Sequence, residues 1–195
     1  MANEADLARI SRIGDSVFAV TITLLAYRVH IPDREALMSG QLAPLAPFFR
    51  DLGALLLSFF VASVFWISHW RVFRRMRQSD NRFVALNLAF LGALILLPIS
   101  TSLLSNDLTW IGTLAYSANL LFGATASLFL RRHACRIDPE AFGPGRLLLA
   151  PAISMTLFAT ACVASLYAPG AALVLWLCAL AGPWIDRRWG IGRSE

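Results

Sequence analysis

The chain has 195 residues, of which 57% are hydrophobic and 15% charged, and its mean hydropathy is positive. A soluble domain of this length does not normally carry so many apolar residues. Several apolar runs approach the roughly 20 residues that cross a bilayer as a helix. The composition therefore predicts a polytopic membrane protein and argues against a soluble domain.

All 17 basic residues are arginines, and they lie in short segments between the apolar runs. This placement favours a role in membrane orientation over binding to nucleic acid. If the N-terminus faces the cytoplasm, 14 arginines fall on the cytoplasmic side, and only Arg28, Arg34 and Arg50 fall on the other. Such a bias fits the positive-inside rule for six spans with both the N- and C-termini cytoplasmic.

The apolar runs predict an all-α fold: a single domain over residues 1–195 with six transmembrane helices. A polar lead-in precedes the first helix, which ends near Pro32 because proline disfavours helix in the residue before it. Asp51 is expected to start the second helix, and His30 and His133 are expected to be solvated loop residues. The predicted helices cover residues 13–29, 51–72, 83–104, 108–130, 147–166 and 171–185.

The first predicted helix separates into two faces when its residues are placed at intervals of about 100°. One face mixes hydroxyl and apolar side chains: Ser16, Val20, Thr23, Leu24 and Tyr27. Rings of apolar side chains can close a pore by excluding water, and rings of hydroxyls can replace part of an ion's hydration shell. A plain packing interface is the commoner explanation of such a stripe, and a pore would need several copies of the chain around an axis.

Asp15 lies on the other face of this helix, among small residues. An acid inside a bilayer is costly and usually faces a partner within the protein. Trp66 and His69 in the second predicted helix and Asn87 in the third are expected at the same depth. A hydrogen-bonded latch between helices is the favoured interpretation, and a proton relay through Asp15 and His69 is the alternative.

The segment RISRIGDSVFAVTITLL at residues 9–25 resembles the opening motif of the transmembrane protein 175 family. That family comprises lysosomal and endosomal potassium channels and their bacterial relatives. Its pattern is an arginine, three residues, Phe-Ser-Asp, and an apolar run ending in Thr-Leu-Leu. Arg9 and Asp15 match it, whereas Ile13 and Gly14 replace the usual Phe and Ser.

Three later segments are also similar to the family, the last of them at residues 116–132, so that the resemblance covers about the first two-thirds of the chain. FWISHWRVF at residues 65–73 resembles the second-helix pattern, with Trp70 in place of a second histidine. Asn87 and LLPIST at residues 96–101 resemble the third helix, with Ser100 in place of a second proline.

The resemblance implies a homotetramer in the cell inner (plasma) membrane, whose first helices line a potassium pore that needs no cofactor. It places the hydrophobic constriction at Val20, the threonine linked to potassium preference at Thr23, and further pore positions at Leu24 and Tyr27. It implies structural roles for a second set of residues: Arg9, Asp15, Trp66, His69 and Asn87. The expected partners are lipid, monovalent cations and three more copies of the chain, without nucleic acid.

Two other classes of function remain as alternatives. A proton-coupled secondary transporter would use Asp15 and His69, but the sequence has no evident inverted repeat. A membrane enzyme is disfavoured because no span carries paired carboxylates and no nucleophile turn is present. The three cysteines have no metal-binding spacing, so no metal site is expected.

Overall fold

The protein is described here by a computed structural model that covers residues 4–38, 45–106, 109–142 and 148–188. Eight helices and no strand form within these ranges. The helices are α1 (Glu4–Tyr27), α2 (Arg34–Met38), α3 (Ala46–Phe73), α4 (Asn81–Asn106), α5 (Trp110–Ile137), α6 (Pro139–Phe142), α7 (Leu149–Tyr167) and α8 (Pro169–Arg188).

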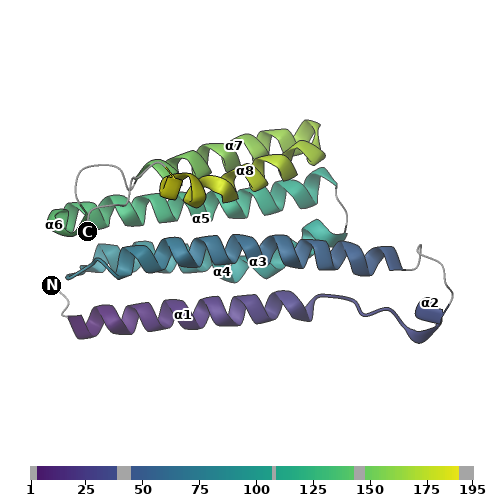
Figure 1. The fold of residues 1–195 in the computed structure, drawn as a ribbon, viewed down its shortest axis with the longest axis horizontal. Coiled ribbons are helices and arrows are strands. Elements are labelled where there is room, and N and C mark those ends of the chain that lie inside the picture. The colour runs from purple at the N-terminus through teal and green to yellow at the C-terminus, as the bar shows by residue number, and fades with distance from the viewer. Residues whose placement is uncertain (1–3, 39–44, 107–108, 143–147, 189–195) are drawn as a thin grey trace.

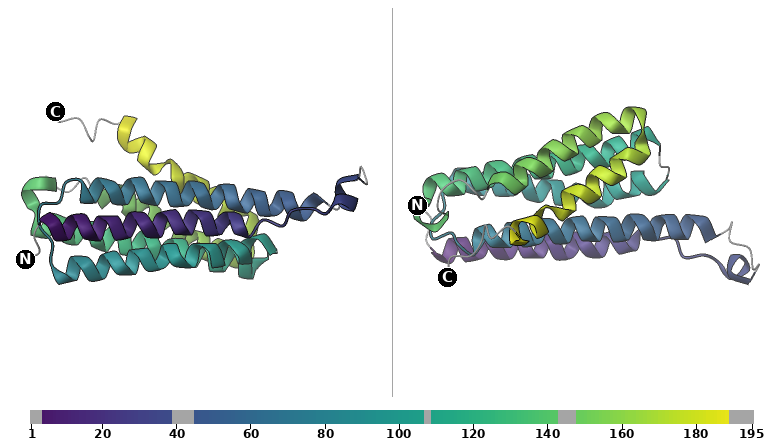
Figure 2. Two further views of the ribbon diagram at one scale, coloured as in Figure 1. Left: turned by 90° about the horizontal axis from the view of Figure 1, so that it is seen from below. Right: turned by 45° about the horizontal axis from the view of Figure 1, so that its top comes forward.

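The six long helices run up and down along one axis of the molecule, as Figures 1 and 2 show. α1 packs against α3 and α4, α4 against α5, α5 against α7, and α7 against α8. The short helix α2 lies at one end of this bundle and α6 at the other, and these ends are called the α2 end and the α6 end below. α1 begins and α8 ends towards the α6 end.

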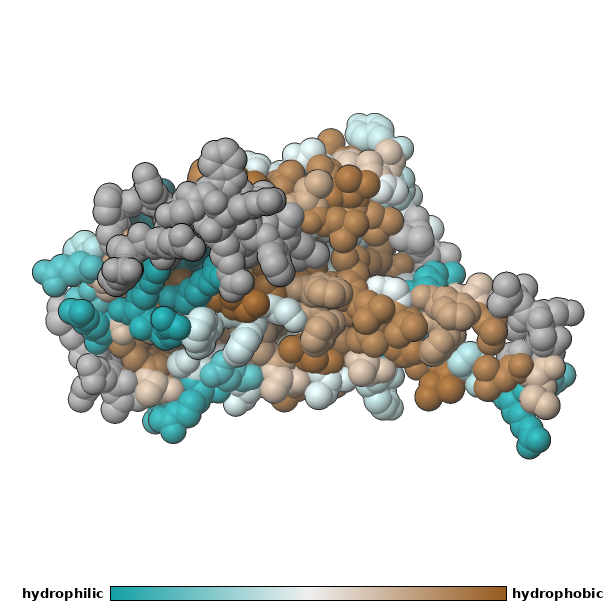
Figure 3. Space-filling view, viewed as in Figure 1, coloured by the Kyte–Doolittle hydropathy of each residue, from teal (hydrophilic) through white to brown (hydrophobic). Residues whose placement is uncertain are grey.

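Among the residues that the structure describes, five helices are long and apolar enough to cross a membrane: α1, α3, α4, α5 and α7. In α8 the apolar stretch whose side chains are described is Pro169–Ala179. Hydrophobic side chains occupy the middle of the face seen in Figure 3, while hydrophilic ones gather towards the α6 end. The predicted all-helical, multi-pass fold is confirmed, and the sixth span and the orientation of the termini stay predictions.

Several helix boundaries differ from those predicted. α1 begins at Glu4 rather than at residue 13, because the polar lead-in is itself helical and buries Leu7. α3 begins at Ala46, with Pro47 in its first turn, so Asp51 lies inside the helix and does not start it. The short helices α2 and α6 were not predicted. Arg146 and Arg193, counted above for the orientation, lie outside the described residues.

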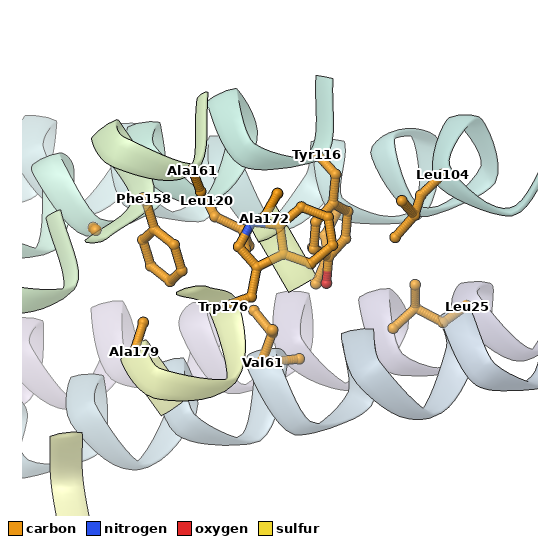
Figure 4. Close-up of a cluster of buried hydrophobic side chains, with 13 residues drawn as sticks. Leu25, Val61, Leu104, Tyr116, Leu120, Phe158, Ala161, Ala172, Trp176 and Ala179 are labelled. Atoms are coloured by element: carbon orange, nitrogen blue, oxygen red, sulfur yellow. The ribbon is translucent and has the colours of Figure 1, made fainter. Parts of the chain in front are cut away.

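The central core joins α8 to the helices on both sides of it (Figure 4). Trp176 of α8 is completely buried, and its ring packs at a centroid distance of 4.7 Å from that of Tyr116 on α5. The indole N–H of Trp176 donates a hydrogen bond to the Ser117 hydroxyl at 3.1 Å. Val61 of α3 and Leu25 of α1 complete this part of the core.

Hydroxyl groups also connect the helices inside the bundle. The Ser58 hydroxyl on α3 lies 2.7 Å from that of Thr101 on α4 and 3.0 Å from that of Tyr116 on α5. Polar side chains buried away from water are costly unless they pair, and in membranes such pairs help to hold helices together. These three groups satisfy one another at the junction of three helices.

At the α6 end, acidic side chains fasten the α3–α4 linker to α5. Asp80 accepts a hydrogen bond from the Phe83 backbone N–H at 2.7 Å and caps α4, and its carboxylate lies 2.8 Å from Nε2 of His133. Burial alone would raise the pKa of Asp80, but these two partners stabilise the carboxylate and lower the pKa. The expectation that His133 is a solvated loop residue was wrong, because α5 continues through it to Ile137.

Truncating the buried indole should destabilise the bundle. Trp176→Ala is expected to lower the free energy of unfolding by about 3 kcal/mol, because it leaves a cavity and removes the hydrogen bond to Ser117. The control Val174→Ala, on the same helix but 60% exposed, should change it by less than about 0.5 kcal/mol. Denaturant titration in micelles measures both, and equal losses would contradict this account of the core.

Candidate functional site on the exposed face of α1

α1 lies against the bundle along one narrow face. Its buried side chains are Leu7, Phe18, Thr21 and Leu25, and Gly14 is buried between them. These residues follow one another at intervals of three, four or seven, which place them on a single side of a helix. The Thr21 hydroxyl donates a hydrogen bond to the Leu94 carbonyl of α4 at 3.4 Å, so this face includes one polar contact.

All five residues of the predicted stripe lie on the uncovered side of α1. Val20 is 56% exposed, Leu24 50% and Tyr27 88%, and Ser16 and Thr23 are also exposed. In a single chain, therefore, none of these side chains is covered by the rest of the bundle.

The two hydroxyls of the stripe bind back to their own helix. Ser16 Oγ donates to the Arg12 carbonyl at 2.9 Å, and Thr23 Oγ1 donates to the Val20 carbonyl at 2.8 Å. Since each hydroxyl has one proton and two lone pairs, a donor used in this way leaves the oxygen as an acceptor towards the outside. Such an oxygen can contact a cation.

The residues of the predicted latch meet where α1, α3 and α4 come together. Trp66 donates its indole N–H to Asp15 Oδ1 at 3.0 Å and so joins α3 to α1. His69 Nε2 lies 2.8 Å from Asn87 Oδ1 and joins α3 to α4. Arg9 is exposed on α1, and the structure shows no hydrogen bond between it and these four described residues.

The imidazole of His69 is enclosed by aromatic rings and by Gly14. It stacks on Phe90 of α4 at a centroid distance of 5.3 Å and lies 5.8 Å from the ring of Phe18 on α1. A Cβ atom added at Gly14 would lie 3.0 Å from His69 Cε1. Glycine in place of the serine usual in the family motif therefore gives the imidazole its room.

The two members of the alternative proton relay have different hydrogen-bond partners. Asp15 has Trp66 as its hydrogen-bond partner and His69 has Asn87, and the structure shows no hydrogen bond between Asp15 and His69. A relay needs the two groups within hydrogen-bonding reach, directly or through one water. This pairing favours a bracing role for both side chains.

At the α2 end, a second set of hydrogen bonds, which the sequence did not predict, holds the segment that follows α1. Arg28 donates a hydrogen bond to the Ser102 hydroxyl of α4. Both the backbone N–H of His30, at 3.2 Å, and its Nδ1, at 2.7 Å, contact Asp51 Oδ2 on α3. His30 is thus not simply a solvated loop residue, although its side chain is 81% exposed. These partners are far apart in the chain, and no local pattern signals them.

These features define a helical, multi-pass membrane protein whose first helix is held near its middle and just beyond its C-terminal end and is uncovered along one face. The family model described as endosomal/lysosomal potassium channel TMEM175 matches residues 9–98, which include most of α1, all of α3 and most of α4. Over these residues the chain thus resembles the TMEM175 family, as its motifs predicted.

Individual proteins agree with this assignment. A potassium channel of Chamaesiphon minutus is 29% identical over 173 residues, covering 77% of this chain and 85% of its own. One of Streptomyces collinus is 27% identical over 145 residues, covering 70% of each chain. The crystal structure of a lysosomal potassium-selective channel TMEM175 homolog from Chamaesiphon minutus matches with a TM-score of 0.82 at 22% identity, covering 93% of this chain and 98% of that chain. This last match shows a shared fold.

A methyl group at Gly14 should disturb the helix junction. Gly14→Ala would normally stabilise a helix by up to about 1 kcal/mol, but here the new Cβ presses on an imidazole that Asn87 and Phe90 hold in place. We expect a lower melting temperature in detergent. The matched control is Gly92→Ala, also within a long helix, whose Cβ would meet nothing within 4 Å. That variant should melt at the same or a higher temperature, and a higher melting temperature for both would contradict the proposed contact.

Proposed function

We propose that the chain is the subunit of a homotetrameric potassium channel in the cell inner (plasma) membrane, with α1 of each subunit lining the pore. The permeant ion is K⁺, no cofactor takes part, and the channel is not an enzyme. In this proposal α8 forms the sixth span and both termini are cytoplasmic. The relatives support the potassium selectivity, since they are named as potassium channels.

One observation carries the proposal: the family match begins on α1, and this helix leaves its mixed stripe uncovered. A fourfold arrangement around that stripe would cover Val20 and Thr23 in every subunit at once. Cyclic assembly is the usual way in which identical chains enclose a central axis.

In the proposed pore, Val20 and Thr23 have different tasks. Four Val20 side chains form an apolar ring that excludes water when it is narrow, and this ring is the constriction. Thr23 lies about 4.5 Å further along the helix axis, and four Thr23 oxygens can replace water around a dehydrating cation. Leu24 lies beside this layer, and Tyr27 and Ser16 lie nearer the two ends of the pore.

The helix junction supports this pore from behind. It holds the middle of α1 against α3 and α4 through four residues: Asp15, Trp66, His69 and Asn87. Arg9 precedes this junction by nearly two turns, where an arginine suits the aqueous boundary of a span. In this proposal none of the five touches the ion.

A polar residue at the constriction should open it to water. Val20→Asn is expected to raise passive potassium efflux from proteoliposomes several-fold, because the ring then binds water, whereas Val20→Leu should keep efflux at or below the level of the unchanged chain. Tetramer formation is checked by size-exclusion chromatography for each variant. Absence of passive flux from correctly assembled protein, or flux that requires a pH gradient, would overturn the channel proposal.

The hydroxyl layer should govern the choice of ion. Thr23→Ala removes the oxygen that faces the proposed pore and is expected to lower the potassium-to-sodium permeability ratio several-fold. Thr23→Ser keeps the oxygen and should retain most of that ratio. Reversal potentials under bi-ionic conditions measure both variants. A ratio unchanged in Thr23→Ala would remove Thr23 from the selectivity mechanism while leaving the constriction at Val20 untouched.

A further inference from the structure

A groove opens at the α2 end of the bundle, on the face where α3, α4 and α8 meet. It has a volume of about 210 Å³. Its walls are apolar: Ala54 and Leu57 of α3, Leu104 of α4 and Leu173 of α8. It is separate from the stripe of α1, and nothing in the proposed pore uses it.

The groove suits a hydrocarbon chain better than water molecules. Apolar walls give a water molecule none of the two to four polar partners that it needs. Ser105, which also lines the groove, donates its hydroxyl to the Ser102 carbonyl at 3.2 Å. Because α3 and α4 are candidate membrane spans, a groove on their surface meets lipid tails wherever it is not covered by protein.

The mouth of the groove is basic. Arg50 lines it and is exposed, and the described residues offer this guanidinium no hydrogen-bond or ion-pair partner. Phe49 lies beside it, 55% exposed, with its ring packed edge-on to that of Phe48. A guanidinium next to aromatic rings at the end of an apolar span has the composition of a membrane-interface site for phosphate groups.

The acidic residue next to Arg50 in the sequence pairs with another residue. Asp51 is adjacent to Arg50 in sequence, but its carboxylate is buried and contacts His30 at 2.7 Å. The first turn of α3 contains no acidic residue, and its N-cap Leu45 makes no side-chain capping bond. The free N–H groups at this helix start add to the positive potential around Arg50.

We propose that this groove binds an anionic phospholipid, with one acyl chain against Ala54, Leu57, Leu104 and Leu173 and the phosphate at Arg50. The acyl chain gains little by moving from the bilayer, since lipid tails are as apolar as leucine. Selection among lipids therefore depends on the charged headgroup and on the fit of the chain in the groove.

Gly53 provides a way to block the groove without disturbing the helix. It lies in α3, lines the groove, and a Cβ added there would meet nothing within 4 Å. Leucine at this position fills the space of the acyl chain and also raises helix propensity. Gly92→Leu is the matched control, because Gly92 has the same open surroundings on α4 and does not line the groove.

Native mass spectrometry of the purified protein tests the proposal with phosphatidylglycerol and phosphatidylcholine added separately. The unchanged chain should retain one phosphatidylglycerol per subunit in preference to phosphatidylcholine. Arg50→Gln should lower phosphatidylglycerol retention about fivefold or more, and Arg50→Lys should keep part of it. Gly53→Leu should lower the retention of both lipids, while Gly92→Leu leaves retention unchanged. Arg34→Gln, another arginine near the α2 end, should have no effect.

Two results would overturn this inference. The first is equal retention of phosphatidylglycerol by the unchanged chain, Arg50→Gln and Gly53→Leu. The second is a loss of oligomer mass in Gly53→Leu with unchanged lipid per subunit, which would show that a second copy of the chain covers the groove. Neither readout involves ion flux, so failure here is distinguishable from failure of the proposed channel function.

Discussion

The position of α1 depends on one imidazole. His69 of α3 contacts α4 through Asn87 and Phe90, and it contacts α1 through Phe18 and the space left by Gly14. A buried polar ring is tolerated when it is hydrogen-bonded and its faces are packed, and His69 meets these conditions through Asn87 and the surrounding aromatic rings, so the three helices have little freedom at this point. Asp15 and Trp66 add a hydrogen bond between α1 and α3 nearby.

Contacts at two separated points set the rotation of the second half of α1. The His69 junction holds the middle of the helix, and Arg28 and His30, which follow its last turn, bind α4 and α3 at the α2 end. Between these points the helix turns Thr21 and Leu25 inward, so Val20 and Thr23 must face outward. The register of the stripe is thus set by contacts on the opposite side of the helix, and the stripe itself contributes nothing to the stability of the single chain.

The sequence predicted those parts that depend on local periodicity. Apolar runs gave the long helices, and the 100° spacing gave the stripe from Ser16 to Tyr27, because both follow from neighbours along one helix. The ends of α1 and α5 were missed, since polar residues at the α6 end remain helical when tertiary contacts such as Asp80 with His133 support them. The pairing of His30 with Asp51 and that of Ser58 with Tyr116 join distant segments, and no spacing rule predicts such partners.

On a membrane protein, unlike on a soluble one, exposed apolar surface does not by itself indicate a protein interface. Lipid tails solvate Leu and Val well, so an uncovered face does not by itself call for a partner. α7 illustrates this, because Thr156 and Thr160 are also exposed and also bind back to their own helix carbonyls. The hydroxyl geometry of Thr23 is therefore not what distinguishes α1. α1 differs in being anchored by a carboxylate and an imidazole, both costly inside a membrane. A helix that only met lipid would not need its rotation fixed so firmly, whereas the proposed pore of four copies would require it.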